Sequence, residues 1–297
     1  MLEWLWVETG DGERLRAWVA GPPGAEPVFL ITGGASDGRA WRFVVSELCE
    51  DPLELVHATS HPSLAEDLRV AGYDQRGTGA SSGAVPPESS ALGAEHAGAV
   101  GSAVLGSRFH LVGESLGGMA AMRLALARPD LVASLVLVAT SSGGAGLTPP
   151  DDAFLANITG GGPVDPRQRA RQNLALSCGA RFPEEHPDLF EALVDKSLGQ
   201  PASPDAWAAQ AQCFATHDVT DALPSLAVPT LVVCGTEDKV MRPPNSDYLA
   251  AAIPGAELVT LEGVGHAVDL EAPDQLAAAV SGHVRRHPIR LGTKAGA

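Results

Sequence analysis

Short apolar runs recur along the chain, and most of them stop at glycine, proline or small polar residues. The first two runs, residues 2–9 and 13–19, flank Gly10-Asp-Gly12 and predict a β-hairpin. Continuous apolar runs, which are typical of strands buried on both faces of a parallel sheet, then follow. They span residues 27–34, 68–74, 109–113, 131–139, 230–234 and 257–261. We therefore expect a sheet of about eight strands.

Helical patterns fill the stretches between these predicted strands. Runs of small and apolar residues without a breaker predict helices at 116–127, 245–252 and 273–287. Strands that alternate with helices indicate an α/β fold with a mostly parallel sheet, covered on both faces. Between residues 141 and 226 the strand signals vanish, and we expect helices at 168–177, 187–198 and 204–216. The sequence thus predicts one core, residues 1–140 and 227–297, interrupted by a helical cap at 141–226.

Composition and charge narrow the classes of partner. The 297 residues are 45% apolar, which is enough material for a large buried core. The formal net charge of −16 would repel a phosphate backbone or an anionic bilayer, so we expect neither nucleic acid nor membrane as a partner. No apolar run is long enough to span a bilayer, and the N-terminus lacks a basic leader. The four cysteines form no C-x-x-C pair, so we expect reduced thiols and a cytoplasmic location.

A serine pentapeptide follows one of the predicted buried strands. Gly113-Glu-Ser-Leu-Gly117 matches G-x-S-x-G, in which the glycines permit a strained turn that lifts the Ser115 hydroxyl above the sheet edge. Chance alone gives roughly 0.2 such matches in a chain of this composition, so the motif has to be judged together with the residues on either side of it. An apolar strand precedes the motif and a helix of small residues follows it. Strand, sharp turn and helix together favour Ser115 as a nucleophile.

A serine hydroxyl needs a base to take its proton and an acid to hold that base. Asp238 follows the predicted strand 230–234, and His266 follows the strand 257–261. Because the carboxyl ends of parallel strands meet at one edge of a sheet, we expect Ser115, Asp238 and His266 to lie together. The expected chemistry is nucleophilic catalysis.

Such catalysis also requires two N–H donors aimed at the oxyanion of the transition state. Leu116 can supply one because it follows the nucleophile, and Gly34, at the end of an earlier strand, is expected to supply the other. His57 and His61 suggest a metal site, but no carboxylate and histidine cluster at metal spacing accompanies them. We therefore expect no metal and no cofactor, and an ordinary loop around residues 50–66.

The chain resembles the α/β-hydrolase superfamily over about residues 12–285. The loop Asp74-Gln-Arg-Gly-Thr-Gly-Ala-Ser81 matches the D-x-R-G-x-G-x-S pattern of one branch, and further similarity lies at 227–238, 252–257 and 265–273. Within that branch, the helical cap and the chain length are similar to the aclacinomycin methylesterase type of polyketide-tailoring esterase. Enol-lactonases and cofactor-free haloperoxidases resemble it closely as well.

The resemblance assigns a role to each matched position. It implies Ser115 as nucleophile, His266 as general base and then acid, Asp238 as the group that orients it, and Gly34 and Leu116 as oxyanion donors. Asp74 and Arg76 are implied to hold the loop after their strand. One departure from the pattern is a longer connection between Gly34 and Asp74, by about fifteen residues, which we expect to form a loop at the entrance to the site.

These features predict a serine hydrolase that cleaves an ester or related acyl bond of a hydrophobic small molecule, such as a polyketide-like natural product. Aromatic side chains that would suit such a substrate are Phe154, Phe182, Phe190, Trp207 and Phe214 in the cap and Trp41 in the core. Three alternatives stay open at this point: C–C cleavage or non-hydrolytic coupling by the same triad, proline-type aminopeptidase activity with Glu184, Glu185 or Glu191 as amine ligands, and a non-enzymatic small-molecule receptor. A monomer and a homodimer are both compatible with the sequence.

Overall fold

The computed structural model describes residues 1–34, 36–58, 62–106, 108–199 and 203–289. Over these ranges, eight strands form one sheet in the order β1-β2-β4-β3-β5-β6-β7-β8. The strands are β1 (Glu3–Glu8), β2 (Arg14–Ala20), β3 (Pro27–Ile31), β4 (Arg69–Tyr73), β5 (Phe109–Glu114), β6 (Val132–Val138), β7 (Thr230–Gly235) and β8 (Glu257–Leu261). The pairs β1/β2 and β2/β4 are antiparallel and all other neighbours are parallel. The expected hairpin and the mostly parallel sheet are confirmed.

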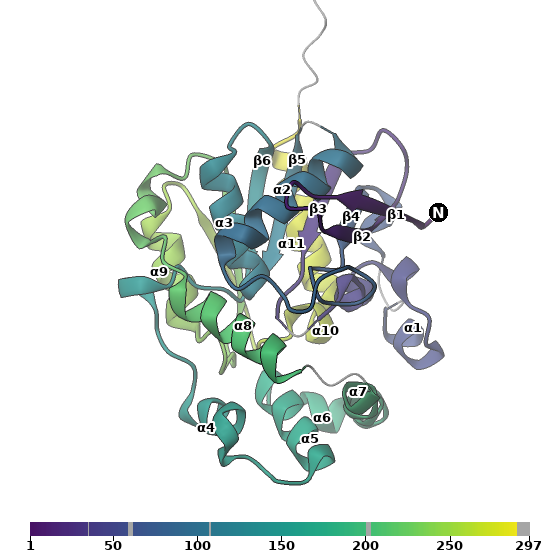
Figure 1. Cartoon of the computed structure of the whole chain (residues 1–297), viewed down its shortest axis with the longest axis vertical. Coiled ribbons are helices and arrows are strands. Elements are labelled where there is room, and N and C mark those ends of the chain that lie inside the picture. The colour runs from purple at the N-terminus through teal and green to yellow at the C-terminus, as the bar shows by residue number, and fades with distance from the viewer. Residues whose placement is uncertain (35, 59–61, 107, 200–202, 290–297) are drawn as a thin grey trace, which may run out of the picture.

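Helices cover both faces of this sheet, as Figure 1 shows. On one face lie α2 (Ser90–Leu105), α3 (Leu116–Ala127) and α9 (Pro243–Ala252), whose apolar side chains share a buried cluster with β3, β5 and β6. The other face is covered by α11 (Pro273–Arg286), the short α10 (Val268–Glu271) and the 3₁₀ turns at Gly38–Phe43, Ser46–Leu48 and Leu64–Glu66. Strands such as β5 and β6 are buried along their whole length because both their faces are covered, which explains their continuous apolar runs.

The segment 141–226, here called the cap, carries helices and no named strand in its described residues. They are α4 (Asp152–Ala156), α5 (Pro166–Ser177), α6 (Phe182–Glu185), α7 (Pro187–Gly199) and α8 (Pro204–Thr216). Asp165 and Ser203 accept hydrogen bonds from the first turns of α5 and α8, which fixes where these helices begin. Figure 1 shows α4 to α7 at one end of the molecule, below the sheet, with α8 between them and the core.

The longer connection before β4 departs from the expected loop. Residues 52–58 form the helix α1 (Pro52–Ala58), and the buried carboxylate of Glu54 is ion-paired with Arg42 of the core and Lys196 of the cap. The expectation of a plain loop was wrong for this part, because a helix there buries Ala58 beside Phe182 of the cap. Residues 59–61 lie outside the described residues, so the predicted loop position of His61 stays a prediction.

Helix α2 has no counterpart among the helices expected from the sequence. Its glycines lower helix propensity, yet they let it pack closely on its neighbours. A Cβ on Gly93 would lie 3.3 Å from the Cβ of Ala120, and one on Gly101 would lie 2.7 Å from the Phe109 ring. Tertiary packing therefore overrides a weak local pattern. No described helix is both long and apolar enough to cross a bilayer.

Candidate active site

Ser115 occupies a strained turn between β5 and α3. Its φ of 53° and ψ of −122° lie in a region that residues with a Cβ rarely adopt. The N–H of Ser115 donates to the carbonyl of Val138 at 3.0 Å, and the carbonyl of Ser115 accepts from the hydroxyl of Thr140 at 2.7 Å. A Cβ on Gly117 would lie 2.3 Å from the carbonyl oxygen of Thr32, so the turn requires glycine there. Contacts from two neighbouring strands thus hold the strained serine in place.

The structure brings Ser115, His266 and Asp238 into one hydrogen-bonded chain. The Ser115 Oγ lies 3.2 Å from His266 Nε2, and His266 Nδ1 lies 2.9 Å from Asp238 Oδ2. Asp238 is 3% exposed and Ser115 is 7% exposed. The candidate nucleophile, base and orienting acid are therefore within hydrogen-bonding reach of one another, beyond the carboxyl ends of β5, β7 and β8.

Asp238 is oriented by the loop that carries it. Its Oδ1 accepts hydrogen bonds from the backbone N–H groups of Val240 and Met241, both at 2.8 Å, which leaves Oδ2 for His266. Burial disfavours the imidazolium of His266, but the charge and the hydrogen bond of Asp238 more than offset it and raise the pKa of His266 above its ordinary value. The imidazolium that forms after proton transfer is thereby stabilised.

The cap fixes the backbone of the histidine loop. The N–H groups of His266 and Ala267 both donate to the carbonyl of Ser177 at the end of α5, at 2.7 and 3.1 Å. The carboxylate of Glu271 accepts from Gly179 at 2.6 Å and from Gly265 at 3.0 Å. Burial raises the pKa of Glu271 to about 7. Sequence reasoning missed these contacts because three of the four bonds join segments about ninety residues apart through backbone groups.

Glu114 lies beside the triad rather than in contact with solvent. Its side chain is buried, as is that of Asp269, and the two carboxyl groups are joined by a hydrogen bond. Two carboxyls can share such a bond only when one of them keeps its proton. Burial and the negative charges of Asp269 and Asp238 raise the pKa of Glu114 well above its usual range, so Glu114 is the donor. This bond links the turn of Ser115 to the segment that follows His266.

The two residues that the sequence predicts as oxyanion donors, Leu116 and Gly34, lie beside the turn of Ser115. Leu116 is the first residue of α3, so the helix itself offers its N–H no acceptor. The Gly33-Gly34 pair packs against the same turn: a Cβ on Gly33 would lie 3.1 Å from the Cβ of Ser115. A Cβ on Gly34 would lie 3.0 Å from both Leu116 Cδ1 and Gln210 Oε1. We refer to Gly33, Gly34 and Leu116 together as the oxyanion corner.

A small niche opens at the oxyanion corner. It is bordered by Gly33, Gly34 and Leu116 and by apolar or small groups that include Pro86, Pro87, Ala120 and Cys213. Gln210 of α8 closes it from the cap side. The Cys213 thiol is inert there, because burial raises its pKa to about 11. Its volume of about 20 Å³ leaves room for one small group, of the size of a water molecule or a methyl.

The cap aromatics are divided between packing and solvent. Phe182 and Phe190 are buried in a cluster with Phe43 and Leu270, whereas Trp207 is 46% exposed. A larger cavity, of about 600 Å³, adjoins the niche. Neither of the two is bordered by Trp41 or by any of the five aromatic residues that the sequence singled out in the cap. Trp41 is buried in the core cluster of the sheet, and Phe154 and Phe214 are partly buried.

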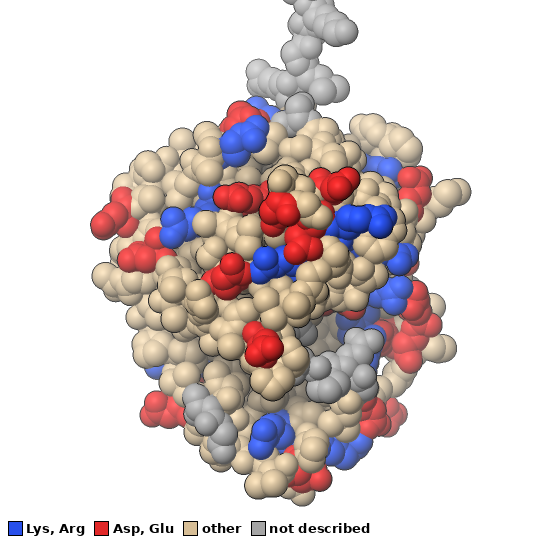
Figure 2. Space-filling view, viewed as in Figure 1, with Lys and Arg blue, Asp and Glu red and all other residues tan. Residues whose placement is uncertain are grey.

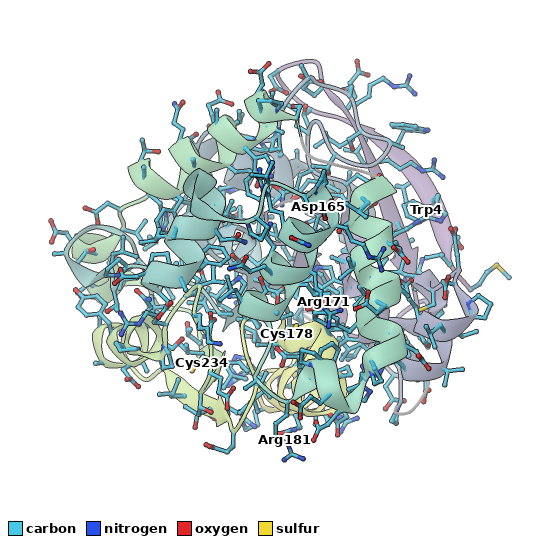
Figure 3. All side chains as sticks on the ribbon, turned by 90° about the horizontal axis from the view of Figure 1, so that it is seen from below. Trp4, Asp165, Arg171, Cys178, Arg181 and Cys234 are labelled. Atoms are coloured by element: carbon cyan, nitrogen blue, oxygen red, sulfur yellow. The ribbon has the colours of Figure 1, made fainter. Side chains whose placement is uncertain are left out.

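The three cap carboxylates lie away from the candidate triad. Glu191 is ion-paired with Arg167 and Arg171, and Glu185 is ion-paired with Arg181. Figure 3 shows Arg181 pointing outward at the margin of the molecule. Glu184 is exposed. These contacts argue against a buried amine-binding site built from the three residues.

Asp74 and Arg76 hold the loop after β4. Asp74 accepts hydrogen bonds from the N–H groups of Gly38 and Ala80 at 2.9 and 2.8 Å, and Arg76 is ion-paired with Glu88. Among the described residues, His57 belongs to no group of histidine, cysteine and carboxylate side chains that could hold a metal ion, and its Nε2 lies 2.8 Å from the carbonyl oxygen of Leu270. The geometry agrees with the structural roles that the resemblance implies.

One other group in the described ranges has the composition of a metal site. Donor atoms of Glu257, His283 and His287 lie within 4.8 Å of one another. The exposed carboxylate of Glu257 is ion-paired with Arg286 at 2.9 Å. This group lies where β8 begins and α11 ends, whereas the candidate triad follows the carboxyl ends of the strands. It therefore takes no part in the candidate active site.

Comparisons with known proteins agree with this geometry. The chain is 29% identical to the rhodomycin D methylesterase DauP of Streptomyces sp. strain C5, over 93% of this chain and 97% of that protein. It is 26% identical to the putative carbamate hydrolase RutD of Yersinia enterocolitica, over 85% of each. Among solved structures, Est816, described as an N-acyl homoserine lactone degrading enzyme, superposes with a TM-score of 0.74 at 28% identity, over 94% of this chain and 99% of that one.

The family match covers most of the chain. The sequence model described as the alpha/beta hydrolase family matches residues 28–279, a range that contains β4 to β8, all of β3 but its first residue, the cap and all five candidate site residues. Relatives named as hydrolases or esterases match over nearly their full lengths. The chain belongs to the alpha/beta hydrolase family.

Proposed function

We propose that this protein hydrolyses a carboxylic ester of a hydrophobic small molecule through an acyl-enzyme on Ser115. The hydrogen-bonded chain from Ser115 through His266 to Asp238 is the observation that carries the proposal. Its three members follow the ends of three parallel strands, and nothing in folding alone calls for a strained serine beside a partly buried histidine and a buried aspartate. Catalysis accounts for all three features together.

The first half of the reaction transfers the acyl group. His266 Nε2 takes the hydroxyl proton as Ser115 Oγ attacks the ester carbonyl. The negative charge that develops on the carbonyl oxygen is stabilised by the N–H groups of Leu116 and Gly34. The bond to the alcohol oxygen then breaks, the proton passes from His266 to that oxygen, and the alcohol leaves. Ser115 is left as an ester of the acyl group.

The second half releases the acid by the same route. His266 takes a proton from water, and the resulting hydroxide attacks the acyl carbonyl. The bond to Ser115 Oγ breaks and His266 returns the proton to it. Asp238 stays ionised throughout and keeps the Nδ1 proton of His266 in place.

The apolar residues of the niche support an ester that carries a small apolar group next to the reacting carbonyl. Leu116, Ala120 and the prolines at 86 and 87 offer apolar contact beside the serine, within reach of the oxyanion corner. The names of the relatives, a methylesterase and an N-acyl homoserine lactone degrading enzyme, support a carbonyl ester as the reacting group. We extend the proposal to natural-product esters on the likeness to the rhodomycin D methylesterase.

A series of 4-nitrophenyl esters of increasing acyl length tests the proposal, alongside labelling by a fluorophosphonate probe. The purified protein is expected to hydrolyse the apolar esters and to be labelled on Ser115, while Ser115→Ala does neither. Absence of labelling in a folded wild-type protein would refute the serine mechanism. Labelling without turnover of any ester would instead favour C–C cleavage or coupling by the same residues, and turnover of a proline anilide would favour an aminopeptidase.

A further inference from the structure

A larger cavity adjoins the oxyanion corner on the side of the β1–β2 hairpin. It encloses about 600 Å³, which lies within the range of small-molecule sites. Four residues border both this cavity and the niche: Ser36, Thr78, Pro86 and Gln210. Figure 2 shows a hollow between core and cap with blue Lys and Arg atoms at its rim. We call this cavity the distal basin.

The wall of the distal basin contains a tryptophan between two arginines. The Arg16 guanidinium lies 4.7 Å from the centre of the Trp4 ring, and that of Arg39 lies 5.3 Å from it. Trp4 belongs to β1 and Arg16 to β2, and Figure 3 shows Trp4 beside these strands, to the side of the cap helices. Stacking on an aromatic face holds a guanidinium in place while leaving its N–H edge free.

The two guanidinium groups differ in what their N–H donors bind. Arg39 donates to the carboxylate of Glu50 at 2.9 Å. Within the described ranges, the side chain of Arg16 has neither a hydrogen-bond acceptor nor a carboxylate partner; its contacts are the rings of Trp4 and Trp6. Arg16 is also only half-buried. A stacked guanidinium whose donors have no acceptor among the described residues therefore borders a cavity that adjoins the niche.

The acidic side chains of the distal basin are already engaged. Asp74 accepts from the N–H groups of Gly38 and Ala80, one with each oxygen. Asp37 Oδ1 accepts from the N–H of Arg39 at 2.9 Å and caps the turn that begins at Gly38. Neither carboxylate is within ion-pair distance of Arg16, so neither neutralises its guanidinium directly.

We infer that Arg16, stacked on Trp4, binds a carboxylate carried by the substrate at the end remote from the scissile ester. The inference rests on the proposed ester hydrolysis and names the class of substrate, an ester whose apolar middle part connects the reacting carbonyl to a free acid. A guanidinium presents two parallel N–H donors that match the two oxygens of a carboxylate. The apolar part begins at the niche, and the acid reaches the distal basin past Thr78 and Gln210, which border both.

The test compares 4-nitrophenyl monoesters of dicarboxylic acids, from succinic to suberic, with neutral counterparts in which the free acid is a methyl ester and the 4-nitrophenyl ester is kept. The wild-type kcat/KM is expected to favour the acid over its neutral counterpart at one chain length, the one that spans niche and distal basin. In Arg16→Gln the ratio of acid to neutral kcat/KM is expected to fall about tenfold, chiefly through KM, because a charge-assisted hydrogen bond is lost. Arg16→Lys, which keeps the charge without the planar pair of donors, is expected to fall between the two.

Arg14→Gln is the matched control. Arg14 lies two residues earlier on β2 and stacks on Trp6 at 5.0 Å, but it does not border the distal basin. The acid-to-neutral ratio of this variant is expected to equal that of the wild type. A wild type without preference for any acid of the series, or an Arg16→Gln ratio equal to that of Arg14→Gln, overturns the inference.

A binding measurement separates this inference from the proposed reaction. Calorimetric titration of Ser115→Ala with monomethyl esters of the same diacids requires no turnover. Binding that weakens about tenfold on adding Arg16→Gln supports the carboxylate site even if no ester is hydrolysed. If esters are hydrolysed but the monomethyl esters bind no more tightly than the neutral dimethyl esters, the proposed function stands and the carboxylate site is refuted.

Discussion

The backbone N–H of His266 donates a hydrogen bond to the carbonyl of Ser177, 2.7 Å away. Ser177 ends a cap helix and His266 follows the last strand of the sheet, so the cap directly positions the candidate base. The carboxylate of Glu271 strengthens the same junction through Gly179 and Gly265. The cap therefore does more than cover the site, because it also sets the height of the imidazole above Ser115.

Glu271→Ala is expected to loosen this junction. Two buried N–H groups would lose their acceptor, at a cost of about 1–3 kcal/mol each in the free energy of unfolding. A shifted imidazole is expected to lower kcat by about tenfold or more. Glu271→Gln, which keeps one carbonyl acceptor, is expected to recover part of kcat. Urea unfolding and steady-state kinetics check both effects, and an unchanged kcat in Glu271→Ala would show that the junction does not position His266.

Ser115→Ala is expected to abolish turnover while leaving the fold intact. Alanine has the same Cβ as serine, so the positive φ of this turn costs both residues a similar strain. Without the nucleophile, kcat is expected to fall roughly 10⁴–10⁶-fold. Circular dichroism and thermal unfolding of the variant should match the wild type. Residual turnover within tenfold of wild type would contradict a covalent mechanism.

Asp238→Asn is expected to lower kcat about 10³–10⁴-fold. The side-chain oxygen of asparagine can keep the hydrogen bonds from Val240 and Met241, which places its amide N–H against His266 Nδ1. The imidazole proton then moves to Nε2, which faces Ser115 and can no longer accept its proton. Kinetics of the folded variant measure the loss, and near-normal activity would assign the orienting role to another acid.

The same pair predicts the pH dependence of the reaction. Because the pKa of His266 is raised, the base form is reached only above the ordinary histidine range, and kcat/KM is expected to increase with pH through that raised value. Asp238→Asn removes the charge that offsets burial, so the acidic limb is expected to move to lower pH in what activity remains. A limb at the same pH in both proteins would mean that a different group titrates.

Two glycine substitutions near Ser115 are expected to have different effects, one on stability and the other on kcat. A Cβ at Gly117 would meet the backbone oxygens of Thr32 and Ile31 at 2.3 and 2.4 Å, so Gly117→Ala is expected to lose about 3 kcal/mol of stability or not to fold. At Gly34 the neighbours are the flexible ends of Leu116 and Gln210, and Gly34→Ala is expected to fold. Its crowded oxyanion corner should lower kcat about 10–100-fold. Wild-type activity in a folded Gly34→Ala would place the oxyanion elsewhere.

Glu114→Gln is expected to stabilise the protein at alkaline pH. The raised pKa of Glu114 means that the folded state holds its proton more tightly than the unfolded chain does. The stability it contributes is therefore complete below the unfolded pKa and is lost as pH rises through the folded one. Glutamine keeps a donor toward Asp269 at every pH. The free energy of unfolding of the variant, measured in urea at pH 6 and pH 9, is expected to fall less than that of wild type.

The control for this comparison is Glu185→Gln. Glu185 lies on the exposed surface of the cap, where it pairs with Arg181, and the same chemical change there should leave the pH dependence of unfolding as in wild type. Equal slopes for Glu114→Gln and wild type would show that Glu114 loses no proton over this range.

The sheet could be predicted from the sequence because its strands are buried on both faces. Runs such as 131–139 and 230–234 have no polar interruption, and the glycines and small polar residues after them show where the strands end. Helix α2 could not be predicted in this way. Its glycine and alanine pattern carries little amphipathic contrast, and its stability comes from close packing on α3 and Phe109.

The candidate triad was predictable for a related reason. Ser115 directly follows a strand, and Asp238 and His266 lie in the loops that follow two others. Because parallel strands align their carboxyl ends, chain order alone implied that the three would converge. The bonds that support them were not predictable, because Glu114–Asp269 and Ser177–His266 join segments whose distance in space no local pattern records. The same holds for Arg16 on Trp4.

The sequence by itself determined the strands, their mostly parallel order and the candidates for the reacting groups, because hydrophobic periodicity and strained-turn glycines act locally. Only the tertiary structure decided what surrounds those groups. It placed the carbonyl of Ser177 under His266, buried Glu114 beside Asp269, and left the guanidinium of Arg16 without an acceptor beside the distal basin. Burial, proton affinity and cavity shape depend on which distant segments meet, and this is settled only when the whole chain packs.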